Sequence, residues 1–167
     1  MLSILENLEN SALVEMVGGS AMNQLKIFGL VLFVLLLVDL PMILLINKKM
    51  YTDQFSKLGE SPKGFIVYVY AALCYVIMAI GIQHFAVNQN SFLNSLILGM
   101  VVYGVYNTTN LATLDKYEIK TAGIDTAWGT VLFGIIYLIV ALLSRFVITP
   151  DGEAGTADGP IDTTTEV

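Results

Sequence analysis

Charged side chains are scarce in this 167-residue sequence, where only 13% of the residues are Asp, Glu, Lys or Arg. Soluble globular domains carry about 25%. Cysteine is nearly absent as well, because Cys74 is the only one and lies inside an apolar run. One cysteine excludes an internal disulfide and a site of several thiolate ligands. We therefore interpret Cys74 as a small packing residue.

Recognised catalytic and cofactor motifs are missing too. The sequence has no glycine-rich phosphate loop, no metal-ligand spacing and no nucleophile elbow. We therefore expect no catalytic residues, no metal ligands and no cofactor. An enzyme would depend on Asp39 and Asp125 acting as a paired acid and base, which we place below the other hypotheses.

A basic run or stripe is also lacking. The chain has 8 Lys and Arg against 14 Asp and Glu, and the acidic residues gather near its two ends. No basic surface could follow a phosphate backbone, so nucleic acid is excluded as a partner.

Apolar residues are abundant: they make up 56% of the chain and fall into four blocks. The clearest block covers about residues 27–46 and would reach about 30 Å as a helix, the thickness of a hydrocarbon core. The others cover about residues 65–87, 92–114 and 127–148. They predict an all-α, polytopic membrane protein, a four-helix transmembrane bundle over residues 25–149 in contact with the lipid bilayer.

The two flanking segments differ from the bundle. Residues 1–24 place leucines and other apolar residues on one helical face and glutamates largely elsewhere, which predicts an amphipathic N-terminal segment. Residues 150–167 are acidic and poor in apolar side chains, which predicts a disordered acidic tail.

Lysines predict the orientation of the bundle. Four spans would place two lysine-bearing loops on one side, with Lys26 and Arg145 on the other. Cytoplasmic loops carry an excess of basic residues, so we expect both termini outside, N-out and C-out. The loop lysines are Lys48, Lys49, Lys57, Lys63, Lys116 and Lys120.

Polar side chains inside a span are costly, so each is a candidate for function. Asp39 lies in the first span, about 10 Å below its cytoplasmic end by helical rise. It could instead be a buried acceptor that holds helices together. Asp125 and Trp128 begin the fourth span, where an aspartate commonly caps a helix and a tryptophan commonly belongs to the interfacial belt.

The third span carries a polar stripe. Tyr103, Asn107 and Asn110 recur at i, i+4 and i+7, and Thr109 lies beside them in the same polar run. Amide side chains on such a stripe commonly join helices by hydrogen bonds, although they could also coordinate an ion or polar ligand.

These polar residues come from three spans and reach similar depth, which predicts a polar pocket open to the cytoplasmic side. The second span offers little to it. The candidate binding residues are Asp39, Tyr103, Asn107, Thr109, Asn110, Asp125 and Trp128.

The stretch from Tyr103 to Leu114, followed by Asp125-Thr-Ala-Trp-Gly129, resembles a family of uncharacterised small membrane proteins best known from bacteria. That family typically shows Tyr-Asp-x-Thr-Asn-Leu-Ala-Thr-Leu and then Asp-x-x-Trp-Gly at the start of its last span. The resemblance covers about residues 27–148 and implies a four-span fold, without implying an activity. Asn107 stands where the family usually has Asp.

Two functional hypotheses follow. In the first, the pocket binds or transports a cation or small polar ligand, and four spans would then call for a homo-oligomer. In the second, the bundle is a structural or anchoring protein that contacts a partner protein through its N-terminal helix or acidic C-terminal tail. The second would suit a bacterial accessory protein of the cell membrane or a component of the internal membrane of a virus particle.

Overall fold

The computed structural model describes residues 21–59 and 64–148, and every regular element within them is a helix. The amphipathic segment predicted over residues 1–24 lies outside them up to residue 20, and the acidic tail predicted over 150–167 lies outside them entirely. The all-α prediction is confirmed for the described part of the chain.

The first long helix, α2, spans Ala21–Pro41 and continues directly into a π-helical turn, η2, at Met42–Ile46. Pro41 has no N–H to give to the preceding turn, so the regular α-helical pattern ends there. The chain then closes a wider ring, in which the Asn47 backbone N–H donates to the Met42 carbonyl at 2.8 Å.

The loop predicted between the first two spans contains a helix of its own, α3, at Lys48–Leu58. The second long helix, α4, spans Phe65–Ile82 and ends in another π-helical turn, η3, at Gln83–Val87. A short turn leads to α5 at Phe92–Thr113.

The last helix, α6, spans Ile119–Val147 and therefore begins well before the predicted start at residue 127. Its first turns are buried through Thr121, Ala122 and Asp125. Because one face of these turns packs against the rest of the protein, the helix extends in the N-terminal direction beyond its apolar block, into a more polar stretch.

Among residues 21–59 and 64–148, three helical segments are long and apolar enough to cross a membrane: Ala21–Ile46, Phe65–Val87 and Ile119–Val147. The prediction of several apolar helices of spanning length is therefore confirmed. The helix α5 is not among them, because the polar residues of its second half lower its apolar character.

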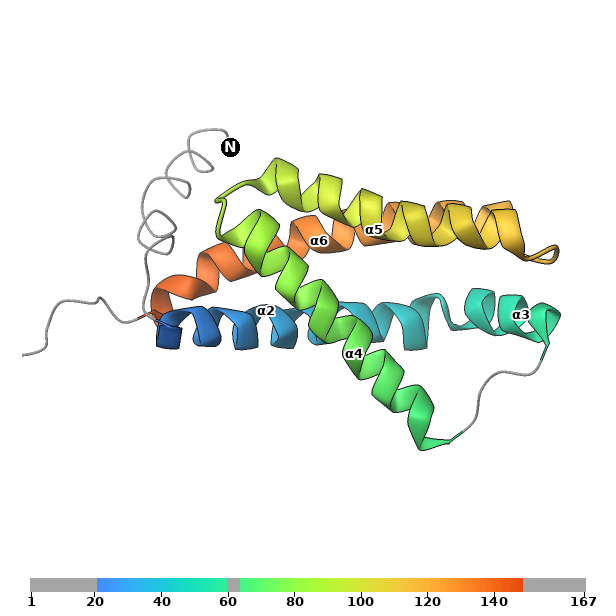
Figure 1. The fold of residues 1–167 in the computed structure, drawn as a ribbon, viewed down its shortest axis with the longest axis horizontal. Coiled ribbons are helices and arrows are strands. Elements are labelled where there is room, and N and C mark those ends of the chain that lie inside the picture. Colours follow the sequence, from blue (N-terminus) through green and yellow to red (C-terminus); the bar gives the residue numbers. More distant parts are fainter. Residues whose placement is uncertain (1–20, 60–63, 149–167) are drawn as a thin grey trace, which may run out of the picture.

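The helices α5 and α6 run side by side, while α4 crosses the others obliquely and its first half leans away from them (Figure 1). The contact between α5 and α6 is close at two glycines. A Cβ atom on Gly99 would lie 2.5 Å from the carbonyl oxygen of Gly129, so only glycine fits. The buried apolar core comes mainly from α2 and α6, including Ile27, Val31, Leu132, Phe133 and Ile136.

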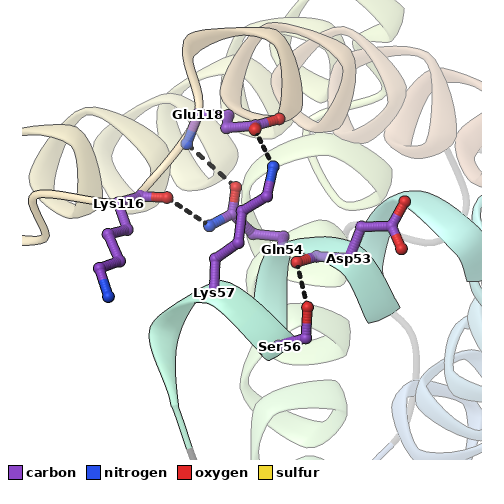
Figure 2. Close-up of polar contacts among 6 residues, drawn as sticks. All are labelled: Asp53, Gln54, Ser56, Lys57, Lys116 and Glu118. Carbon is purple, nitrogen blue, oxygen red and sulfur yellow. Dashed lines mark hydrogen bonds and ion pairs between the residues drawn. The ribbon is translucent and has the colours of Figure 1, made fainter.

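The helix α3 is fixed to the segment before α6 by one buried side chain, Gln54 (Figure 2). Its Nε2 donates to the Lys116 carbonyl at 2.9 Å, and its Oε1 accepts from the Glu118 backbone N–H at 3.0 Å. An exposed ion pair between Lys57 and Glu118 lies beside it and contributes little, because water screens it. Gln54 therefore holds α3 in place.

Replacing Gln54 with leucine keeps the volume and removes both hydrogen bonds. We expect a loss of about 2 kcal/mol, because two backbone groups lose their partner in a partly buried site. Thermal unfolding and hydrogen exchange at the Glu118 amide measure it. Ser56→Ala is the control, since the Ser56 hydroxyl is exposed and bonds only within α3. Equal stability of the two variants would contradict this role of Gln54.

Candidate functional site

Asp39 is buried near the end of α2, and both of its carboxylate oxygens accept hydrogen bonds from other helices. Trp128 Nε1 of α6 donates to Oδ1 at 2.9 Å, and the Tyr75 hydroxyl of α4 donates to Oδ2 at 2.8 Å. Asp39 thus joins α2, α4 and α6, as a buried carboxylate must be fully hydrogen-bonded to be tolerated.

Asp125 is the second buried carboxylate, in α6. The Tyr51 hydroxyl of α3 donates to its Oδ1 at 2.5 Å, and Asn107 Nδ2 of α5 donates to its Oδ2 at 2.8 Å. Burial first, and then this bond to Asp125, hold the pKa of Tyr51 well above its usual range. The hydroxyl therefore stays protonated and remains a donor.

Asn107, the residue that donates to Asp125, is itself buried. Its Nδ2 also donates to the Tyr103 carbonyl at 2.9 Å, and its Oδ1 accepts from the Tyr117 hydroxyl at 2.6 Å. Both ends of the amide are therefore used, and the bond to Tyr117 requires the amide oxygen to point toward the α5–α6 turn.

The two carboxylates line one cavity of about 370 Å³. Its wall comes from α2, η2, α3, α4, α5 and α6. It contains four tyrosines and Phe55 but no Lys, Arg or His. The tyrosines are Tyr51, Tyr75, Tyr103 and Tyr106. The donors that reach Asp39 and Asp125 are all neutral, so they stabilise the carboxylates without cancelling their charge.

Five of the seven residues singled out from the sequence meet at this place: Asp39, Tyr103, Asn107, Asp125 and Trp128. The other two do not. Thr109 is exposed on α5, and Asn110, which is half-buried, does not line the cavity.

Three interpretations of single residues change with the structure. Asp125 does not cap α6, because that helix begins at Ile119 and its N-cap position is Glu118. Trp128 is not a free interfacial side chain, since its N–H is bound to Asp39. The second span does contribute, through Tyr75.

Sequence reasoning missed three donors: Tyr51, Tyr75 and Tyr117. Tyr75 lies in an apolar run, where a tyrosine is normally counted for its ring rather than its hydroxyl. Tyr51 lies in a loop whose helical structure was not predicted. A signal for these donors was present in the sequence. An aspartate inside a span needs a hydrogen-bond donor for each carboxylate oxygen, and tyrosine hydroxyls of neighbouring helices can provide them.

Metal-ligating side chains are dispersed over residues 21–59 and 64–148. Within them, no group of three or more His, Cys, Asp or Glu side chains could hold a metal ion. Asp39 and Asp125 are the only two such acids in the cavity, and each oxygen already accepts a hydrogen bond.

Comparison with known proteins places the chain in a family. No curated protein and no solved structure matches the chain. A family model described as a predicted membrane protein, DUF2177, matches residues 24–150 and so includes every residue of the site. The resemblance seen in the sequence is thereby confirmed at the level of the family, and the chain belongs to this DUF2177 family of membrane proteins.

Proposed function

We propose that the protein binds a cation in the intramembrane cavity between Asp39 and Asp125. The observation that carries this proposal is a pair of buried carboxylates in one cavity whose lining holds no basic side chain. Burying a charge is expensive unless something compensates it. Hydrogen bonds from Tyr, Trp and Asn offset part of that cost, and a bound cation would offset more.

The proposal includes α5 as a fourth span. Its 22 residues would reach about 33 Å, which is enough to cross a hydrocarbon core. Its buried polar side chains are Ser95, which bonds to the Phe92 carbonyl of the same segment, and Asn107, which points at Asp125 rather than at lipid. The exposed hydroxyls of Thr108 and Thr113 donate to carbonyls of the same helix, at 2.7 and 2.8 Å. A lipid-facing helix can tolerate hydroxyls satisfied in this way.

The proposed orientation places α3 and the α5–α6 turn on the cytoplasmic side. Gln54 joins these two segments, so their lysines lie at one end of the bundle. Excess lysine on that end favours both termini outside. If the protein moves its ligand across the membrane, a homo-oligomer is expected, because four spans are few for alternating access.

The test uses the only tryptophan of the chain, Trp128, whose N–H is bound to Asp39. Purified protein in lipid nanodiscs is titrated with the chlorides of Na⁺, K⁺, Mg²⁺ and tetraethylammonium. We expect a saturable change in tryptophan fluorescence with at least one cation, weakened at least tenfold in Asp39→Asn and in Asp125→Asn.

The control is Asp53→Asn, which removes an exposed carboxylate from α3 and should leave the titration unchanged. Circular dichroism verifies that each variant is folded. No saturable change with any of the four cations would refute the proposed function. The structural or anchoring role depends on the two tails, which lie outside the described residues, and stays a prediction.

A further inference from the structure

The cavity wall combines negative charge with apolar surface and has no positively charged side chain. Two carboxylates supply its charge, and most of the remaining surface is aromatic or aliphatic, with Phe55, Met78 and Tyr106 among the lining residues. Aromatic faces attract cations that shed water easily, and quaternary ammonium groups are the standard example. A volume of about 370 Å³ lies in the range of sites for small organic molecules.

An inorganic cation fits this wall poorly. Calcium takes six to eight oxygen ligands and magnesium keeps an octahedral shell. Here the four carboxylate oxygens of Asp39 and Asp125 each already accept a hydrogen bond from Tyr75, Trp128, Tyr51 or Asn107. Each oxygen keeps a second lone pair for a cation, but the two carboxylates supply fewer oxygen ligands than the six or more that either ion takes. A cation that needs charge but few ligands is favoured.

Most of the exposed lining of the cavity lies on α4 and α5, at the flank of the bundle. Five lining residues are exposed: Phe55 on α3, Ala71 and Cys74 on α4, and Val102 and Tyr106 on α5. The first half of α4 also leans away from the other helices (Figure 1). Exposed side chains in the middle of spanning helices meet lipid, so this opening leads into the bilayer rather than only into water.

We infer that the cavity takes a lipophilic organic cation, a quaternary ammonium ion or protonated amine with apolar substituents, which enters from the bilayer between α4 and α5. This inference rests on the proposed function and names its ligand class. The carboxylates of Asp39 and Asp125 attract the charge, the aromatic wall receives the apolar groups, and the lateral opening admits a molecule that partitions into lipid.

The experiment uses benzyltrimethylammonium as the probe and Cys74 as a natural label on the lining, in phosphatidylglycerol nanodiscs. We expect the probe to change Trp128 fluorescence at a concentration at least tenfold below that of K⁺ or Mg²⁺. It should also slow alkylation of Cys74 by N-ethylmaleimide at least fivefold. Both effects should be lost in Asp39→Asn.

The route is tested separately with two neighbouring valines of α5, both exposed. Val102 lines the cavity and Val101 does not. Val102→Phe should slow association of the probe at least threefold in stopped-flow fluorescence, and Val101→Phe should leave it unchanged. Equal association rates for the two variants would overturn lateral entry.

The remaining outcomes separate the two proposals. If K⁺ or Mg²⁺ binds as tightly as the probe and depends on Asp39, the proposed function stands and the organic ligand class is overturned. If no cation binds, both are overturned. If adding phosphatidylcholine alone protects Cys74, the choline headgroup is the occupant, and the inference of a free cation fails.

Discussion

Gly99→Ala is expected to destabilise the protein by about 2–3 kcal/mol, the cost typical of overpacking a tight contact. The added Cβ would lie 2.5 Å from the Gly129 carbonyl oxygen and 3.0 Å from the Thr130 Cα. These neighbours are backbone atoms, which cannot rotate away as a side chain can. The helices α5 and α6 would therefore have to separate, and the hydrogen bond from Asn107 to Asp125 between them would lengthen.

The same exchange at Gly123 is the matched control. It lies in α6, and nothing is within 4 Å of the position that its Cβ would take. Alanine favours a helix over glycine by about 1 kcal/mol, so Gly123→Ala should be neutral or slightly stabilising. Thermal unfolding in detergent compares the variants. Gly99→Ala melting at or above the wild-type temperature would show that the helices are not in close contact here.

Asn107→Asp is expected to cost about 3 kcal/mol near neutral pH, in the range for an uncompensated buried charge. The change replaces the amide that donates to Asp125 Oδ2 at 2.8 Å with a second carboxylate. It also removes the donor to the Tyr103 carbonyl. Two carboxylates at hydrogen-bond distance cannot both remain charged without a proton or cation between them.

The loss should therefore shrink as the pH is lowered, because one proton shared by the two carboxyl groups restores a donor. Thermal unfolding of both proteins across a pH series measures this. Asn94→Asp is the control, since Asn94 is exposed in the first turn of α5, where an acidic residue is favourable. A pH-independent difference between Asn107→Asp and the wild type would mean that the new carboxylate does not interact with Asp125.

Asn107→Asp also restores the residue type that the family usually has at this position. The resemblance leads one to expect aspartate where this chain has Asn107. The structure gives the amide a specific use, because Nδ2 donates to Asp125 while Oδ1 accepts from Tyr117. A carboxylate could accept from Tyr117 but could donate to Asp125 only when protonated.

The sequence predicted the apolar helices well, because runs of apolar residues of this length have few structural alternatives. The sequence also predicted that Asp39 and Asp125 lie at similar depth in the bundle, since both lie near the lysine-rich ends of their apolar blocks. That reasoning needed only helical rise and the alternation of direction between spans. The shared cavity that these two residues line is consistent with it.

The remaining features depended on single contacts that no periodic pattern encodes. The helix α3 is polar, and its position depends on single contacts made by Gln54 and Tyr51. Tyr75 resembles any aromatic residue of an apolar helix until its hydroxyl is seen on Asp39. The early start of α6 depends on a buried face that includes Thr121 and Asp125, whose residue types do not suggest burial.

The π-helical turn after Pro41 makes the length of this segment matter more than its chemistry. Each helical residue turns the chain, by about 100° in an α-helix and by less in a wider π-helical turn, so deleting one residue from Met42–Ile46 would change the direction in which α3 faces. Tyr51 would then face away from Asp125, while Asp39 before the turn would keep its place. The apolar side chains of this turn are interchangeable in principle, but their number sets the direction in which α3 presents its tyrosine.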